Sequence, residues 1–326
     1  MQYLLTVPTA YLFGLFAIPL FRKFILGSKL VSSKGIPLVG GLGIAAAFIP
    51  VMLLGLRLAG ALSKESIGLA LSSLMMLVFG VIDDRYELSV LVKFLLQMLA
   101  AAMLVFFGVR TQLVNLGYTP NLLITFVWVL GITNAFNLLD VADGVAAGTA
   151  IIVSLAFATI SLLNADIATA IISLSLAGAT LSFSMFNLPP AKIYLGNGGS
   201  HFLGFLLSAI ALLISYAPLD RKAALFSPLL ILGLPIFDTT FLVLMRIIRK
   251  NLPFRKSNDH LILKYLALGH SKRKALLAIL GLCLFYSLCG IAVSQVSNTF
   301  SVVLMILASC VSLIVAVKMS KVTVNG

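Results

Sequence analysis

Charged residues are scarce in this sequence. They make up 10% of its 326 residues, whereas soluble domains carry about a quarter, so the chain has too few charges to cover a water-soluble globule. The same scarcity excludes a disordered chain, because disordered chains are polar and rich in charge. Hydrophobic residues make up 61%, and a membrane-spanning helix needs about 20 of them in a row. The composition predicts an all-α, polytopic integral membrane protein, with residues 1–326 in a single transmembrane domain.

Cysteine is also rare. Cys283, Cys289 and Cys310 lie inside apolar runs, which argues against a disulfide framework or a cysteine metal site. The net charge is +13, but no basic patch is interleaved with aromatic residues, so we expect no nucleic-acid partner. The positive charge instead indicates orientation in a lipid bilayer, because cytoplasmic loops collect Lys and Arg.

Eleven apolar segments are long enough to span a bilayer. They cover about residues 3–21, 37–56, 66–82, 88–107, 121–139, 145–163, 167–186, 200–217, 225–245, 275–294 and 299–317. With the N-terminus outside and the C-terminus in the cytoplasm, 17 of the 23 Lys and Arg fall in cytoplasmic segments and 5 in outer loops. This charge distribution predicts that orientation in the cell (inner) membrane. The one sizeable cytoplasmic loop, residues 246–274, is strongly basic, and residues 259–268 within it are expected to form a short helix.

Most acidic residues fall at the same membrane edge. Seven of the ten lie at or towards the expected cytoplasmic side. Asp83 and Asp84 end the third span, and adjacent carboxylates at a membrane edge recruit a cation or hold a proton. The alternative is a solvated helix end.

A second polar run ends the fifth span. Asn134, Asn137, Asp140 and Asp143 recur every three residues, so on a continuous helix they fall near one face. Four polar side chains on one stripe are costly against lipid, so we expect them to line a polar cavity. The alternative, a hydrogen-bonded seam between helices, suits the asparagines better than the aspartates.

Glycine-rich segments open two of the spans, at residues 34–41 and 192–200. Free backbone N–H groups at a helix N-terminus suit phosphate oxygens. Lys34, and Lys93 in the fourth span, are either phosphate ligands or charges that orient the chain and reach the headgroups. Carboxylates, glycine turns and basic groups on one side of the membrane together predict a site for Mg²⁺ and a diphosphate on the cytoplasmic face.

In motif order the chain resembles the polyprenyl-phosphate N-acetylhexosamine-1-phosphate transferases. The resemblance runs through residues 34–41, 83–85, 93–97, 134–144, 196–200 and 235–238, and through His260. Members of this family have ten or eleven spans and use Mg²⁺ to transfer a sugar 1-phosphate from a UDP-sugar to a polyprenyl phosphate, releasing UMP. The chain departs from the family pattern where Asn197 replaces an aspartate that ligates Mg²⁺, where Ile262 and Leu263 replace histidines, and where Val141 replaces a glycine.

The resemblance implies roles for the candidate residues. Mg²⁺, with Mn²⁺ as the alternative, is expected at Asp83, Asp84, Asp143 and Asn197. The expected catalytic residues are Asp83, Asp84, Asp143 and His260. The expected substrate-binding residues are Lys34, Lys93, Asn134, Asn137, Asp140, Gly196 and Ser200. The implied substrates are a UDP-N-acetylhexosamine, with N-acetylglucosamine favoured, and undecaprenyl phosphate for cell-wall or surface polysaccharide synthesis; a homodimer is one possible assembly.

Two other functions stay open. A catalytically weakened or inactive relative would bind lipid phosphate or nucleotide without turnover, an alternative that Asn197 and the two replaced histidines keep open. A transporter also buries charged groups, but such sites tend to lie near the bilayer midplane between repeated halves. Here the charges lie at one edge and no repeat is evident, which argues against transport.

Overall fold

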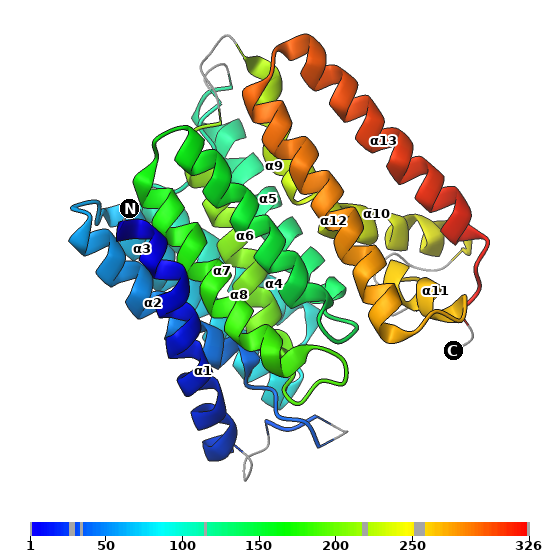
Figure 1. Cartoon of the computed structure of the whole chain (residues 1–326), viewed down its shortest axis with the longest axis horizontal. Helices are drawn as coiled ribbons and strands as arrows, with labels where there is room; N and C mark the ends of the chain where they lie inside the picture. The colour runs from blue at the N-terminus through cyan, green and yellow to red at the C-terminus, as the bar shows by residue number, and fades with distance from the viewer. Residues whose placement is uncertain are drawn as a thin grey trace.

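The computed structural model describes residues 2–25, 30–32, 35–113, 116–216, 221–250 and 258–324. This part of the chain consists almost entirely of helices (Figure 1), with only two isolated β-bridges. In chain order the helices are η1 (Gln2–Leu5), α1 (Thr6–Ile25), α2 (Gly40–Leu58), α3 (Lys64–Tyr86), α4 (Val90–Phe106), α5 (Tyr118–Leu139), α6 (Val145–Leu163), α7 (Ile167–Asn187), α8 (Gly196–Leu213), η2 (Lys222–Phe226), α9 (Ser227–Ile231), α10 (Gly233–Ile248), α11 (Leu261–Ala267), α12 (Lys272–Gln295) and α13 (Asn298–Ser320).

Eight of these helices are long and apolar enough to cross a membrane, namely α2, α3, α5, α6, α7, α8, α12 and α13. The α9–α10 pair adds a ninth if the two are counted as one broken span, and α4 is a shorter apolar helix. The all-α, multi-pass class is therefore confirmed. All eleven predicted segments contain helix, but the described residues give eight or nine spans by length and composition.

The segment predicted as one span at about 225–245 is not a continuous helix. The axis bends by 70° at Leu232, between η2–α9 and α10. Pro235 lies three residues after the bend and has no backbone N–H to donate to the preceding turn, so a regular helix loses a hydrogen bond here. Helix α11 confirms the short helix expected in the basic loop.

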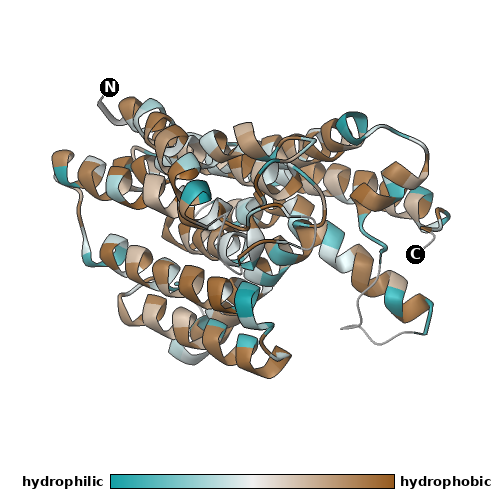
Figure 2. Cartoon of the chain, turned by 90° about the horizontal axis from the view of Figure 1, so that it is seen from below, coloured by the Kyte–Doolittle hydropathy of each residue, from teal (hydrophilic) through white to brown (hydrophobic). Residues whose placement is uncertain are grey.

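Helices α1–α8 form a central group, and α12 and α13 lie beside it (Figure 1). In α7, 83% of the most apolar window is buried inside the molecule, whereas in α13 the share is 11%. Large apolar side chains such as Phe16, Phe106 and Val127 are at least 74% exposed. Figure 2 shows hydrophobic residues along most helix surfaces, with hydrophilic residues near helix ends and in loops. Such outward faces suit contact with lipid.

Five helix ends meet at one edge of the central group. They are the C-terminal ends of α3, α5 and α7 and the N-terminal ends of α6 and α8. The packing of α8 against α3 and α5, and of α6 against α7, brings these ends together. The polar residues that terminate the apolar segments therefore converge in space, although they are far apart in sequence.

Candidate active site

Glycines allow α8 to approach α2 and α3 closely. A Cβ atom placed on Gly80 of α3 would lie 2.5 Å from the Cα atom of Gly198, and one placed on Gly41 of α2 would lie 2.5 Å from the Cα atom of Gly199. Real Cβ atoms do not tolerate such distances, so these positions require glycine for the helices to pack as they do. The contacts set the N-terminus of α8 against the last turns of α3.

Asp84 uses this close approach to cap α8. It lies four residues after Gly80, on the same face of α3. Its carboxylate accepts hydrogen bonds from the backbone N–H groups of Asn197 (2.8 Å) and Gly198 (3.0 Å). A carboxylate from another helix thus satisfies two donors that α8 itself leaves open. The sequence predicted that N–H groups at this helix N-terminus suit a phosphate, but two of them, those of Asn197 and Gly198, donate to Asp84.

The polar run at the end of α5 departs from the continuous stripe that the sequence predicted. The helix ends at Leu139, and the chain turns through residues 140–144 to Gly144, whose φ of 81° is left-handed. The Asp143 carboxylate accepts the N–H of Ala191 (3.2 Å). Asn187, at the end of α7, accepts the N–H of Gly144 (2.9 Å) and donates to the carbonyl of Ile193 (3.0 Å). Asp140 and Asp143 therefore belong to the turn between α5 and α6, and they reach the pocket from this turn.

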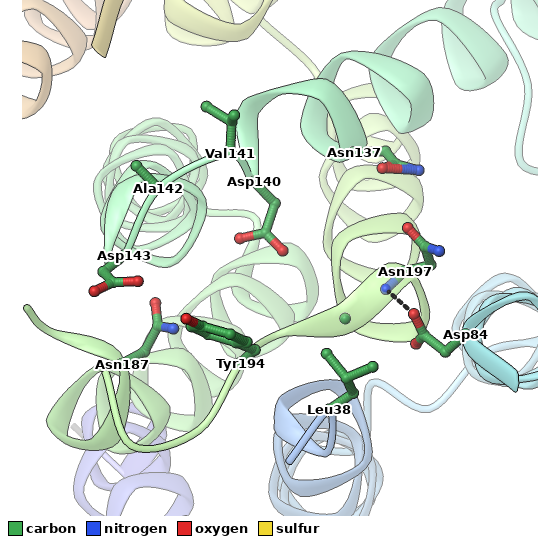
Figure 3. Close-up of a pocket in the computed structure, with 11 residues that line it drawn as sticks. Leu38, Asp84, Asn137, Asp140, Val141, Ala142, Asp143, Asn187, Tyr194 and Asn197 are labelled. Carbon is green, nitrogen blue, oxygen red and sulfur yellow. Dashed lines mark hydrogen bonds between the residues drawn. The ribbon is translucent and has the colours of Figure 1, made fainter. Parts of the chain in front are cut away.

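These elements enclose a polar pocket of about 340 Å³ (Figure 3). Its lining residues are Leu38, Asp84, Asn137, Asp140, Val141, Ala142, Asp143, Asn187, Tyr194, Gly196 and Asn197. Six of them were predicted as site residues from the sequence: Asp84, Asn137, Asp140, Asp143, Gly196 and Asn197. The Asp140 carboxylate points into the middle of the pocket in Figure 3.

Asp140 differs from its neighbours in having no partner for its carboxylate among the described residues, whereas Asp84 and Asp143 accept backbone N–H groups. Enclosure away from bulk water raises the pKa of Asp140 well above its ordinary value, and the carboxylates of Asp84 and Asp143 raise it further. A divalent cation relieves the same repulsion that favours the proton. Asp140 is therefore the pocket carboxylate most available to a cation or to a ligand.

Two of the predicted site residues pair next to the pocket but do not line it. Asp83 is 2% exposed, forms an ion pair with Lys93 (2.8 Å) and accepts the N–H of Leu88 (2.9 Å). Although Asp83 and Asp84 are adjacent in sequence, their carboxylates therefore have separate environments. Lys93 keeps about a third of its side chain exposed, at 34%.

Of the other predicted residues, those that the structure describes do not line the pocket. Asn134 exchanges two hydrogen bonds with Gln97 of α4 (2.7 and 3.2 Å). Ser200 is buried inside α8. His260, N-terminal to α11, bonds through Nδ1 to Asp238 of α10 (2.9 Å). Lys34 lies outside the described residues.

The oxygen donors of the pocket suit Mg²⁺. The described residues contain no cluster of three His, Cys, Asp or Glu side chains arranged as a complete metal site. Mg²⁺ commonly uses one or two carboxylates and takes its other ligands from water and substrate phosphates. Asp140 and Asp143, with the amide side chain of Asn197 in the same pocket lining, fit that pattern of partial protein ligation.

Comparisons with known proteins show the family of the chain. The family model described as glycosyl transferase family 4 matches residues 66–215. A Bacillus subtilis protein, named as a probable undecaprenyl-phosphate N-acetylglucosaminyl 1-phosphate transferase, is 34% identical over 281 residues, which are 82% of this chain and 76% of the relative. The chain belongs to glycosyl transferase family 4. The matched segment of this family-4 protein holds every pocket-lining residue except Leu38.

Two further relatives of this family-4 chain differ in the sugar that their names specify. A decaprenyl-phosphate N-acetylglucosaminephosphotransferase of Mycobacterium leprae is 31% identical, over 74% of this chain and 69% of the relative. A phospho-N-acetylmuramoyl-pentapeptide-transferase of Geobacillus kaustophilus is 31% identical, over 65% of this chain and 72% of the relative.

Sequence reasoning missed three polar residues in or beside the pocket of this family-4 chain. Asn187 joins the turn at Gly144 to the loop before α8, and the signal for it was a polar residue at the end of an apolar span. Tyr194 lines the pocket and lies between Asn187 and Leu38 in Figure 3. His201, which no motif in the sequence singled out, contacts Asn137. Its role depends on tertiary packing that no local pattern reveals.

Proposed function

We propose that the protein transfers N-acetylglucosamine 1-phosphate from UDP-N-acetylglucosamine to undecaprenyl phosphate or a similar polyprenyl phosphate, releasing UMP. The observation that carries the proposal is the pocket at the helix ends, where three aspartates meet amide side chains in a family-4 chain. Two relatives whose names specify N-acetylglucosamine support the choice of sugar. The site would face the cytoplasm, and the lipid-linked product would serve cell-wall or surface polysaccharide synthesis.

The proposed reaction is a phosphoryl transfer between two anionic substrates. An oxygen of the lipid phosphate attacks the β-phosphorus of the UDP-sugar, and the bond from that phosphorus to the oxygen bridging to the α-phosphorus breaks. UMP leaves with that bridging oxygen and its electron pair. Such reactions depend mainly on positioning and on neutralising charge.

The charged residues in and around the pocket then have proposed roles. Asp140 and Asp143 would hold Mg²⁺ together with the diphosphate, and the ion would neutralise the charge that develops on the phosphate oxygens. Asp84 fixes the N-terminus of α8, so it acts on the site through the position of Asn197. Lys93 and His260 are proposed phosphate contacts, and each is held by a buried aspartate.

The proposal is tested with UDP-N-acetylglucosamine labelled with ³²P at the β-phosphorus. Purified protein in lipid nanodiscs is incubated with undecaprenyl phosphate and Mg²⁺, and the label is followed into the organic phase. We expect the label in the lipid product and unlabelled UMP in water. Transfer of the sugar alone would leave the label in UDP and contradict the proposal.

A matched pair of variants ties the activity to the pocket. Asp140→Asn should lower the rate by roughly 100-fold or more, because one charged group at the phosphoryl site is lost. Asp166→Asn should keep the wild-type rate. Asp166 is the N-cap of α7 and follows the C-terminus of α6, whereas the pocket lies at the N-terminus of α6, and Asn serves equally as an N-cap. A wild-type chain that binds UDP-N-acetylglucosamine but never labels lipid would support the non-catalytic binder that Asn197 keeps open.

A further inference from the structure

His201 contacts two residues that line the pocket, although it does not line the pocket itself. It lies in the first turns of α8 and is 3% exposed. Its Nδ1 atom is 2.9 Å from the carbonyl oxygen of Asn197, and its Nε2 atom is 2.9 Å from the amide nitrogen of Asn137 in α5. The imidazole therefore bridges the two helices whose ends carry Asn137 and Asn197.

The chemistry of these partners fixes the tautomer of His201. A carbonyl oxygen only accepts, so Nδ1 must carry a proton and donate it to Asn197. Among the described residues no carboxylate forms an ion pair with His201, and an unpaired buried charge is costly. The ring is therefore neutral, and Nε2 is an acceptor.

An acceptor at Nε2 also fixes the side-chain amide of Asn137. Only the NH₂ group of that amide can donate to Nε2, so its oxygen must point the other way. Figure 3 shows this oxygen on the side of the Asn137 amide that faces Asp140 and the pocket. With its NH₂ group engaged by His201, Asn137 presents an acceptor to the pocket.

We propose that His201 is a positioning residue that holds the Asn137 amide with its oxygen toward the pocket, where that oxygen accepts a hydrogen bond from an O–H or N–H group of the nucleotide sugar. This inference rests on the proposed function for the identity of the ligand. An acceptor at this position favours a donor sugar that carries a matching O–H or N–H group, because a buried acceptor left without a donor is penalised.

The tautomer is testable without any activity. The chain has three histidines, His201, His260 and His270, so ¹⁵N-histidine labelling of the full-length protein in nanodiscs gives three ring systems. His201→Gln assigns one of them by its disappearance. We expect His201 to be neutral with the proton on Nδ1. A proton on Nε2, or protons on both nitrogens, would overturn the proposal.

A double-mutant cycle tests whether His201 acts through Asn137. Dissociation constants for UDP-N-acetylglucosamine are measured at saturating Mg²⁺ for wild type, His201→Leu, Asn137→Ala and the double variant. Each single change should weaken binding by about tenfold, and the double variant should be no weaker than Asn137→Ala alone. His201→Gln, which returns an acceptor oxygen near the position of Nε2, should restore most of the loss.

The outcomes separate this inference from the proposed function. Additive losses in the cycle, or a His201→Gln variant as weak as His201→Leu with an unchanged melting temperature, would overturn the positioning role. If the variants change the Mg²⁺ concentration needed for binding but leave the affinity for UDP-N-acetylglucosamine at saturating Mg²⁺ unchanged, the assignment of the Asn137 oxygen to the nucleotide sugar is overturned. If His201→Leu does not fold, His201→Met takes its place in the cycle. A wild-type protein that shows this coupling in binding but never transfers phosphate would contradict the proposed function alone.

Discussion

Asp84 and Asp140 face the same pocket but have different electrostatic partners. Asp84 accepts two backbone N–H groups from α8, so its charge is used to stabilise a helix terminus. The carboxylate of Asp140 has no such partner among the described residues, and its pKa is raised by enclosure and by its acidic neighbours. We therefore propose a structural role for Asp84 and a ligand-binding role for Asp140, two aspartates that the sequence alone does not distinguish.

This division predicts different results for the same substitution. Asp84→Asn leaves one N–H of α8 facing an NH₂ group, and a buried donor without an acceptor costs about 1–3 kcal/mol, so both the melting temperature and the activity should fall. Asp140→Asn breaks no internal bond, so only the activity should fall. Thermal melts and label transfer of the purified variants measure both. Equal destabilisation by the two changes would contradict the assignment.

Asn197 places an amide where the family pattern has a carboxylate. An amide oxygen binds a hard cation more weakly than a carboxylate oxygen does. We predict that Asn197→Asp lowers the Mg²⁺ concentration for half-maximal activity several-fold, whereas Asn197→Ala raises it. A titration of the initial rate with Mg²⁺ gives the three values. No difference between Asn197→Asp and the wild type would show that this side chain does not contact the cation.

The sequence predicted most pocket residues but not how each is used. Asn137, Asp140 and Asp143 were identified because polar groups at the end of an apolar span are costly against lipid. The assumed helical stripe was wrong, because α5 ends at Leu139 and the next residues turn. Asn134, inside α5, pairs with Gln97 and does not line the pocket. The partners of His201 and Asn187 are distant in sequence and could not be inferred from it.

At the scale of elements, the crossing of α3 and α8 positions the site. Gly80 and Gly198 bring the two backbones into contact one turn before Asp84. That contact is what allows Asp84 to reach the first N–H groups of α8. The distance between the helices thus controls the position of Asn197 in the pocket.

A methyl group at this crossing should separate the helices. Gly80→Ala would place a Cβ atom 2.5 Å from Gly198 Cα and 2.6 Å from Asn197 O. We expect a loss of about 1–3 kcal/mol in stability and a lower rate. Gly131→Ala is the matched control, because a Cβ atom at Gly131 of α5 meets nothing within 4 Å, and alanine favours helix. If both variants melt and turn over like the wild type, the crossing does not position the site.

The elements themselves were largely predictable from hydrophobic runs. Each of the eleven predicted segments contains helix, because the requirement to satisfy backbone groups inside a bilayer leaves helix as the local solution. The bend at Leu232 was missed. The run through it, residues 229–237, has no polar side chain, and an average of hydropathy over 20 residues does not register the effect of Gly233 and Pro235 on the helix axis.

At the scale of the whole molecule, the pocket lies at helix ends that the sequence assigns to the cytoplasmic side. If the N-terminus is outside, 17 of the 23 Lys and Arg belong to the segments assigned to that side. Since cytoplasmic loops collect these residues, the pocket should open to the cytoplasm, where a soluble nucleotide would reach it.

Cysteine labelling tests this orientation. The background is Cys310→Ser, in which the two remaining cysteines, Cys283 and Cys289, are buried. One cysteine is added to it, either at Lys64 at the start of α3 or at Val141, which lines the pocket. In right-side-out vesicles an impermeant maleimide should label Lys64→Cys at once, and Val141→Cys only after the membrane is opened. The reverse pattern would place the pocket outside and contradict the proposed topology.

The most direct test of the account asks whether a divalent cation and a nucleotide's phosphates meet in this pocket. Mn²⁺ is bound to the protein with UDP, and electron–nuclear double resonance measures the coupling of the ion to ³¹P. We predict a ³¹P coupling in the wild type and in Asp166→Asn, and its loss in Asp140→Asn. An absent coupling in the wild type, or an equal one in Asp140→Asn, would contradict the claim that this pocket binds the cation and the diphosphate together.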